Sequence, residues 1–206
     1  WLPALGLGMP SHDAGLTDRE TDLLRELAPD HLRVDLALRG GQWEAPLERA
    51  IGDARTLGTA LELAVSANEA SGHELAGLAA RLLAADVPVA RVLVYALADG
   101  FSAFVTTTPA PIVAFVRDEL EPVIGPVVFA GGTNQNFSDI NRDRPTDPVL
   151  TGLCVSACPT VHAADDRSIV ENLAGLGEMV RFAGEVAAPR SVHVSPVTIA
   201  TRFGPY

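Results

Sequence analysis

Short apolar runs alternate with longer amphipathic runs along the whole chain, and this rhythm limits the possible folds more than any other feature. Strands that alternate with helices in this way are typical of βαβ units in a parallel sheet. The apolar runs predict seven strands, at residues 5–9, 32–36, 61–65, 89–97, 127–130, 153–157 and 191–198.

The amphipathic runs predict the helices between these strands. Thr17 and Glu20 form a capping box, a pattern in which each side chain satisfies a backbone N–H at a helix start. Further helices are expected at 45–57, ending at Gly58, at 74–83, from Thr108-Pro109 to near Pro122, and from Ser168 onward. The buried faces are expected to carry Leu23, Leu24 and Leu27 in the first helix, and Ile169, Leu173, Leu176 and Val180 in the last.

This element order predicts an α/β fold, a (β/α)8 TIM barrel that lacks its last strand in this chain, as one domain over residues 1–206. The 206 residues are also fewer than the roughly 250 of a typical closed barrel. A doubly wound open sheet is the alternative. Gly6 and Gly8 lack the third glycine of a dinucleotide-binding turn, and no acidic residue follows where the ribose contact is expected, so the barrel is favoured.

Composition narrows the class of partner. The formal net charge is −11 and no basic stripe is present, which argues against nucleic acid or an anionic membrane as partner. All 15 basic residues are arginines. Schiff-base aldolase chemistry and Walker-type phosphate binding both need a lysine amine and are excluded. A small molecule is the expected partner, and the oligomeric state is left open.

Two further features bear on location. No apolar run approaches the roughly 20 residues that span a bilayer, and Trp1-Leu2-Pro3 does not resemble the start of a signal peptide. We therefore expect a cytoplasmic protein. Cys154 and Cys158 would lie about 13 Å apart in one strand, too far for a disulfide, so reduced thiols are expected.

The segment after the fifth strand carries a dense group of hydrogen-bonding side chains. The apolar run 127–130 breaks off into Gly131-Gly132, and amides, hydroxyls and a guanidinium follow. The polar stretch 133–147 is long for a βα loop, where roughly 2 to 6 residues are usual. Loops of this kind deliver polar groups to a pocket. The segment therefore predicts a site for a polyhydroxylated substrate.

Candidate site residues follow from the barrel prediction, because active sites of such barrels lie at the carboxyl ends of the strands. The candidates are His12, Asp35, Asn68, Glu69, Tyr95, Thr133, Asn134, Asn136, His162, Ser195, Thr198 and Arg202.

His162 is the candidate general base, because imidazole titrates near neutral pH and Asp165 and Asp166 follow close by to orient it. The alternative is a loop histidine beside a helix N-cap acid. His12 is a second candidate. The remaining histidines, His31, His73 and His193, are expected to be structural.

Asp35 lies between apolar neighbours in a predicted strand, where a carboxylate must be paired or hydrogen-bonded to stay charged. Arg33 shares its side of the strand, so an ion pair in the barrel interior and a role in the site are both open. Arg202 can bind a carbonyl or carboxylate oxygen bidentately, and its alternative is a surface arginine.

The pair Asn68-Glu69 resembles the way in which retaining glycosidases present an acid/base carboxylate. Such an enzyme needs a second carboxylate about 5 to 5.5 Å away, and none follows the seventh strand. The composition 68–72 also suits a turn, which is the favoured interpretation. A metal site is not expected, since HxH, HExxH and CxxC spacings are missing from the sequence.

Three blocks of the sequence resemble the TIM-barrel domain of the D-apionate lactonases. They are Gly131-Gly132-Thr133-Asn134-x-Asn136-Phe137-x-x-Ile140-Asn141-Arg142-x-Arg144-Pro145, Pro159-x-Val161-His162-Ala163-x-Asp165 and Val194-Ser195-Pro196-Val197-Thr198-x-x-x-Arg202-Phe203. The resemblance covers nearly the whole chain. It implies hydrolysis of D-apionolactone to D-apionate in carbohydrate catabolism, and it implies that the barrel continues into further regions of a longer protein.

Ester hydrolysis needs an activated water and donors aimed at the developing oxyanion. Our working hypothesis makes His162 the base that activates water, Asp165 or Asp35 its orienter, and Arg202 the donor to the oxyanion or product carboxylate. The substrate hydroxyls are expected to meet His12, Tyr95, Thr133, Asn134, Asn136, Ser195 and Thr198. No cofactor is expected, and a serine mechanism through Ser195 lacks the G-x-S-x-G elbow. The alternative functions are a glycoside hydrolase and a non-catalytic sugar-binding barrel.

Overall fold

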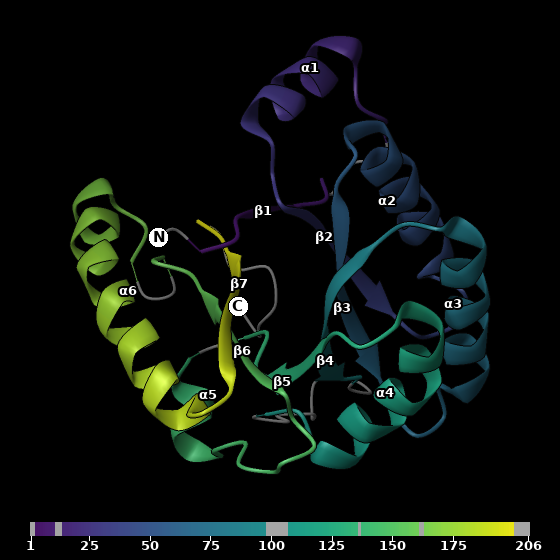
Figure 1. Ribbon diagram of the computed structural model, residues 1–206. Helices are drawn as coiled ribbons and strands as arrows, with labels where there is room; N and C mark the ends of the chain where they lie inside the picture. Colours follow the sequence, from purple (N-terminus) through teal and green to yellow (C-terminus); the bar gives the residue numbers. More distant parts are fainter. Residues whose placement is uncertain (1–2, 11–13, 98–106, 136, 161–162, 200–206) are drawn as a thin grey trace. The chain divides into compact units, whose positions relative to one another are not determined.

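Alternating apolar residues form the strands of the structure, a computed structural model that describes residues 3–10, 14–97, 107–135, 137–160 and 163–199. The parallel strands follow one another in sequence order across one sheet (Figure 1). A doubly wound sheet reverses its strand order at a switch point, so the unbroken order favours the barrel class. The strands are β1 (Gly6–Gly8), β2 (His31–Ala37), β3 (Ala60–Ala67), β4 (Val89–Ala96), β5 (Val128–Gly132), β6 (Gly152–Ala157) and β7 (Ser191–Val197).

Helices connect the strands, as the amphipathic runs predict. The described helices are α1 (Asp18–Leu27), α2 (Glu44–Leu57), α3 (Gly72–Ala85), α4 (Ala110–Ile124), α5 (Ser138–Arg142) and α6 (Asp166–Ala187). The chain divides into two compact units, Trp1–Leu93 with Phe115–Val128, and Val94–Ala114 with Phe129–Tyr206, so that β4 contributes to both. One domain over residues 1–206 stays a prediction.

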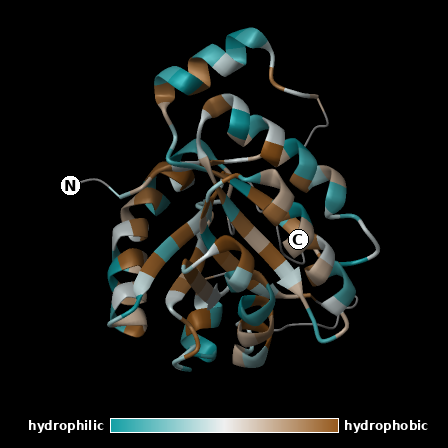
Figure 2. Cartoon of the chain, turned by 45° about the vertical axis from the view of Figure 1, so that its right-hand side comes forward, coloured by the Kyte–Doolittle hydropathy of each residue, from teal (hydrophilic) through white to brown (hydrophobic). Residues whose placement is uncertain are grey.

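In the first unit, the side chains of β2 and β3 alternate between two environments. Every second residue is apolar and buried, and α2 and α3 lie along this side of the strands (Figure 1). Figure 2 shows the pattern as bands of hydrophobic residues along the strands and on the neighbouring helices. Burial of each such side chain stabilises the fold by about 1.5–3 kcal/mol, so the apolar side chains face the helices. The polar side chains of these strands therefore lie on the opposite, helix-free side. The buried set is Leu32, Val34, Leu36, Leu61, Leu63 and Val65.

The capping box at the start of α1 is confirmed. The Thr17 hydroxyl accepts a hydrogen bond from the Glu20 backbone N–H, and the Glu20 carboxylate accepts one from the Thr17 N–H. The predicted buried face of this helix is wrong, because Leu23 and Leu27 are exposed. The described part of α1 packs on α2 rather than on the strands, which leaves little apolar surface to cover those two side chains.

In the second unit, α6 packs against β6 and β7. Leu153 and Val155 form a core with Ala183 and Ala187 of the helix and with Ile140 of α5. The prediction that Leu173 and Val180 belong to the buried side of α6 is wrong, since both are exposed. The helix makes its buried contacts with small alanines near its carboxyl end.

Several predicted boundaries are corrected. Gly131 and Gly132 continue β5 instead of ending it, and the predicted long loop contains α5. Pro122 lies inside α4, which continues to Ile124. The last helix is capped by Asp165 instead of beginning at Ser168. Cys158 lies one residue beyond β6, and both cysteines are free thiols, as predicted.

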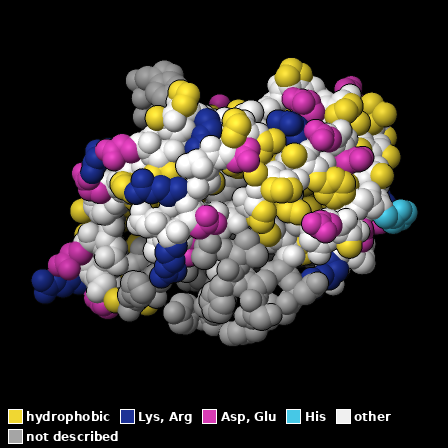
Figure 3. Space-filling view, turned by 90° about the horizontal axis from the view of Figure 1, so that it is seen from below, with side chains coloured by type: hydrophobic (Ala, Val, Ile, Leu, Met, Phe, Trp, Pro, Cys, Tyr) yellow, Lys and Arg dark blue, Asp and Glu magenta, His cyan; other side chains and the backbone are white. Residues whose placement is uncertain are grey.

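The length of the helices and the distribution of charged side chains on the surface concern the class of binding partner. No described helix is both long enough and apolar enough to cross a membrane. On the face in Figure 3, arginine side chains lie singly among aspartates and glutamates, and hydrophobic side chains gather in patches between them.

Candidate functional site

Charged side chains of the first unit gather on the helix-free side of β2 and β3. Arg33 and Glu62 are register partners on the two strands, and they are 3% and 0% exposed. Arg33 donates from Nη2 to Oδ1 of Asp35 at 2.7 Å and from Nε to the same oxygen at 3.2 Å. The ion pair that the shared strand side predicts is therefore present.

Glu62 faces two arginines and a histidine. Its Oε2 atom lies 3.2 Å from Nη1 of Arg91 and 3.4 Å from Nε2 of His31, and Oε1 lies 3.9 Å from Nη1 of Arg33. A buried carboxylate is tolerated only when it is paired with an opposite charge, because its removal from water costs on the order of several kcal/mol. We name these residues, with Asp35, the buried charge cluster.

His31 is the first residue of β2, where the sequence placed it just before the strand, and it is buried at the amino end as a structural residue. It pairs in register with Gly6, and a Cβ atom at Gly6 would lie 2.1 Å from Nε2 of His31. Glycine in β1 therefore makes room for an imidazole ring, which explains this glycine without a dinucleotide.

In the second unit, the segment after β5 is held by buried hydrogen bonds. Thr133 is 3% exposed; its N–H donates to the carbonyl of Cys154 at 3.1 Å, and its hydroxyl donates to Oδ2 of Asp139 at 3.1 Å. The Gln135 N–H donates to that hydroxyl at 3.1 Å, and the Ser156 hydroxyl donates to the Gln135 carbonyl at 2.5 Å. The hydroxyl of Thr133 thus organises the turn, and its contact with substrate stays a prediction.

The remaining described candidates of this unit lie in, or directly after, the carboxyl-terminal parts of β4, β5 and β7. Tyr95 donates from its hydroxyl to the backbone carbonyl of Ser195 at 3.4 Å. The Thr198 N–H donates to the carbonyl of Ala157 at 2.9 Å, just after β6 and β7 end. Asn134 is half-buried in the turn after β5. Their substrate contacts stay predictions.

Asp165 is the N-cap of α6. It accepts hydrogen bonds from the Ser168 N–H at 3.0 Å and the Ser168 hydroxyl at 2.7 Å. The side-chain bond, followed by the backbone bond, lowers the pKa of this exposed carboxyl below its ordinary value. The helix N-cap acid that the alternative for His162 includes is present, and the role of His162 stays a prediction. The proposed partner, His162, lies outside the described residues, as do His12, Asn136 and Arg202.

The turn interpretation of Asn68-Glu69 is supported. The Asn68 side-chain carbonyl accepts hydrogen bonds from the Ala70 N–H at 3.0 Å and the Ser71 hydroxyl at 3.2 Å. Glu69 is exposed. The other two described histidines are His73, exposed on α3, and His193, whose Nε2 lies 2.8 Å from the Ser191 hydroxyl in β7. Within the described ranges, no three His, Cys, Asp or Glu side chains are grouped as metal ligands.

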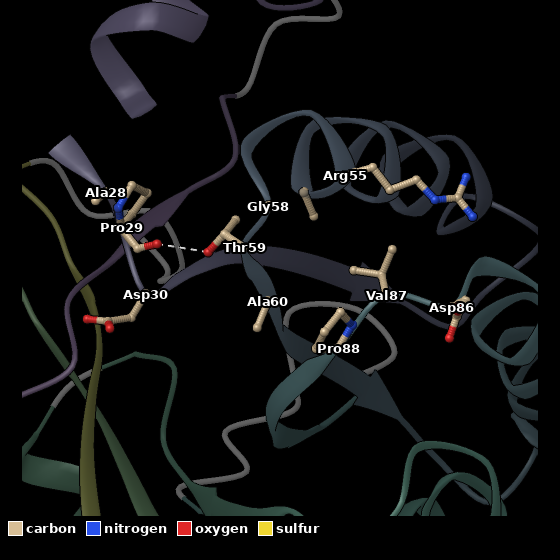
Figure 4. Close-up of a pocket in the computed structure, with 11 residues that line it drawn as sticks. Ala28, Pro29, Asp30, Arg55, Gly58, Thr59, Ala60, Asp86, Val87 and Pro88 are labelled. Carbon is tan, nitrogen blue, oxygen red and sulfur yellow. Dashed lines mark hydrogen bonds between the residues drawn. The ribbon is translucent and has the colours of Figure 1, made fainter. Parts of the chain in front are cut away.

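One cleft of the first unit, with a volume of about 530 Å³, lies at the amino ends of β2, β3 and β4 (Figure 4). Its polar groups form hydrogen bonds between segments that are far apart in the sequence. The Thr59 hydroxyl donates to the Pro29 carbonyl at 2.8 Å, and Oδ2 of Asp30 accepts from the Leu5 N–H at 2.7 Å. Arg55 donates to the Ala85 carbonyl. Barrel enzymes react at the opposite end of the strands. We therefore assign this cleft to structure.

A second cleft, of about 370 Å³, belongs to the second unit. It is lined by Thr107 and by residues 143–147, and the Thr107 hydroxyl donates to Oδ2 of Asp143 at 2.6 Å. Leu150, which also lines it, would lie 2.2 Å from a Cβ atom at Gly131, on the side where Val113 of α4 packs. The cleft therefore opens on the helix side of β5 rather than on the helix-free side.

Sequence reasoning missed three charged residues. Glu62 is a lone carboxylate in the apolar run 60–65, and Arg91 has a similar position in β4. Both are charged residues within an otherwise apolar strand, and this pattern indicates that a buried polar partner lies nearby. Asp139 lay inside the polar segment, and no sequence signal separated this buried acid from its exposed neighbours.

The sequential parallel strands, the helices between them and the polar groups near the strand ends define a protein of the (β/α)-barrel class. Within this class, the chain belongs to the D-apionate lactonase family: residues 5–206 match the family model for the D-apionate lactonase TIM barrel domain. The resemblance and the fold class predicted from the sequence are confirmed. None of the curated proteins matches the chain.

Proposed function

We propose that this chain carries the catalytic barrel of a cytoplasmic hydrolase that opens a sugar-derived lactone, D-apionolactone or a closely similar aldonolactone. Family membership over residues 5–206 is the observation that carries the proposal. The chemistry needs no lysine, in keeping with a sequence whose basic residues are all arginine.

The proposed reaction begins with water. His162 takes a proton from a water molecule as the water oxygen bonds to the lactone carbonyl carbon, and a guanidinium such as that of Arg202 stabilises the oxyanion. The ring C–O bond then breaks, and the imidazolium returns the proton to the leaving alkoxide oxygen. The product hydroxy acid releases its own proton to solvent, so turnover acidifies the solution.

Two carboxylates, Asp35 and Asp165, are candidates for the acid of the proposed site. Both carboxylate oxygens of Asp165 accept hydrogen bonds from Ser168, which commits this group to the cap of α6. Asp35 is held by Arg33 on the helix-free side of β2 and keeps 24% of its side-chain surface exposed. We therefore propose Asp35 as an acid that meets the substrate and Asp165 as the cap of α6.

The sugar hydroxyls are proposed to meet polar groups of the second unit. Tyr95 and Ser195 come from the carboxyl-terminal parts of β4 and β7, Thr198 follows β7, and Asn134 follows β5. The buried bonds of Thr133 support this proposal indirectly, because they fix the backbone that carries Asn134 and Asn136.

Acid release distinguishes the candidate functions. The chain is mixed with D-apionolactone in weakly buffered solution, and base uptake is titrated at constant pH. The proposal expects sustained uptake above the spontaneous rate. A glycoside hydrolase would instead release sugar from a chromogenic glycoside and lose this activity in Glu69→Gln. A sugar-binding barrel would bind lactone without turnover, and either result contradicts the proposal.

A further inference from the structure

The buried charge cluster ends at a single partly exposed carboxylate. Along the helix-free side of β2, His31 and Arg33 are buried, whereas the Asp35 side chain is 24% exposed. Residues later in β2 lie nearer to the carboxyl ends of the parallel strands, which form the catalytic end in barrel enzymes. Asp35 is therefore the member of β2 through which this cluster can meet a substrate.

Arg33 links Asp35 to the rest of the cluster. Two of its nitrogens, Nε and Nη2, donate to one oxygen, Oδ1 of Asp35, at 3.2 and 2.7 Å. Its third nitrogen, Nη1, lies 3.9 Å from Oε1 of the fully buried Glu62. The two hydrogen bonds to one oxygen orient the Asp35 carboxylate, and the opposite charge of Glu62, at ion-pair distance and beyond hydrogen-bond distance, favours this position of the guanidinium.

Glu62 is itself fixed from the far side by Arg91 at 3.2 Å and His31 at 3.4 Å. Charges therefore alternate in sign from Asp35 through Arg33 and Glu62 to Arg91. Each buried charge has an opposite neighbour, which is the condition for keeping such groups ionised away from water. The arrangement is more extensive than is needed to neutralise Asp35 alone.

We propose that Arg33 is a positioning residue for Asp35, anchored by Glu62, and that this geometry sets the turnover rate of the site. The inference rests on the proposed lactonase function for its kinetic consequence. Arg33 itself is almost fully buried and acts through Asp35 rather than on the substrate. A misplacement of a reacting group by about 1 Å can cost on the order of 100-fold in rate, so loss of this grip should lower kcat.

The test compares Arg33→Met, Arg33→Lys, Asp35→Asn and the Arg33→Met/Asp35→Asn double variant. Lysine keeps the charge but cannot place two donors on Oδ1 while facing Glu62. Arg81→Met is the matched control, because it removes an arginine that also pairs with two carboxylates, Glu44 and Glu48, outside the buried charge cluster. Kinetics on D-apionolactone give kcat and KM, and urea unfolding gives the stability of each variant.

We expect Arg33→Met to lower kcat about 100-fold with little change in KM. Arg33→Lys should restore only part of this, and the double variant should be no slower than Asp35→Asn alone. Arg81→Met should keep the parental kcat. Parental kcat in a folded Arg33→Met or Arg33→Lys variant overturns the proposal, as do Arg33 and Asp35 effects that simply multiply.

The unfolding data separate this inference from the function itself. If the parental chain opens no lactone, the proposed function fails. The unfolding free energies of the single and double variants still show whether Arg33 and Asp35 interact. Stability effects that are non-additive support positioning of Asp35 by Arg33. Additive effects show that the two side chains act independently, and they refute it.

Discussion

The hydroxyl oxygen of Thr133 lies 3.1 Å from Oδ2 of Asp139, and both side chains are buried at the start of the segment that follows β5. Nη1 of Arg142 lies 3.3 Å from the other carboxylate oxygen. A short helix, α5, thereby supplies an acid that holds the turn leading out of the sheet. The conformation of the polar segment depends on this pair.

Removal of the Thr133 hydroxyl is therefore expected to destabilise the protein. Thr133→Val keeps the shape of the side chain but leaves the buried Asp139 carboxylate without this donor, which should cost about 1–3 kcal/mol of unfolding free energy. Urea denaturation measures the change. Thr146→Val, at an exposed threonine near the same segment, is the control and should change stability by less than about 0.5 kcal/mol. Equal stability of the two variants would contradict the assignment.

Gly132 should not tolerate a side chain. A Cβ atom there would lie 1.9 Å from the carbonyl oxygen of Cys154, a backbone atom of the neighbouring strand, so β5 and β6 would have to separate. We expect Gly132→Ala to lower the unfolding free energy by roughly 1–3 kcal/mol or more.

The control for this change is Gly175→Ala. Gly175 lies in α6 with no neighbouring atom within 4 Å of the added Cβ, so the variant should gain up to about 1 kcal/mol from helix propensity. Thermal unfolding followed by circular dichroism compares the two. A Gly132→Ala variant as stable as the parental chain would show that the strands are not as close as described.

Glu62 should be the most sensitive carboxylate of the first unit. Glu62→Gln removes the negative charge that two buried or half-buried arginines face, and loss of one partner from a buried ion pair costs about 3–5 kcal/mol. Glu48→Gln removes an exposed ion pair with Arg81 and should cost about 1 kcal/mol or less. Denaturant midpoints of the two variants test this, and similar values would be inconsistent with a buried cluster.

Asp165 gives the stability of α6 a pH dependence. Hydrogen bonds from Ser168 lower its pKa in the folded state, so the ionised carboxylate contributes stability above the ordinary value of 3.8. That contribution is lost as pH falls through the lower folded-state pKa. Asp165→Asn keeps a capping side chain without the charge.

The Asp165→Asn variant should therefore melt below the parental protein near neutral pH, and the difference should shrink toward pH 3 and below (about one unit under the ordinary carboxyl pKa). Asp165→Ala should melt lower still, since it also removes the cap. Melting curves across this pH range provide the measurement. A difference that grows on acidification would have the wrong sign for a lowered pKa.

Much of the fold could be predicted because each strand and helix carries its own local signal. The apolar run 153–157 and the capping box at Thr17 are examples, and both are where the sequence places them. Which helix face is buried depended on tertiary packing. Leu23 and Leu173 have helical spacing, yet both are exposed.

The candidate site was less predictable for a related reason. Asp35 and Arg33 could be paired because residues two apart in a strand share a side. Glu62 and Arg91 come from other strands, and only the register of the sheet shows that they meet this pair. The roles of Asp165 as cap and of Thr133 as the anchor of a turn also required coordinates, since both residue types suit a ligand site equally well.

The central claim, that His162 drives lactone opening, is tested most directly by the kcat of His162→Ala on D-apionolactone. Product D-apionate is followed by NMR beside the parental chain and His73→Ala, a change at an exposed histidine of α3. The proposal predicts that His162→Ala loses about 10²–10⁴-fold in kcat, while His73→Ala keeps the parental rate. Equal product formation by His162→Ala and the parental chain would contradict it.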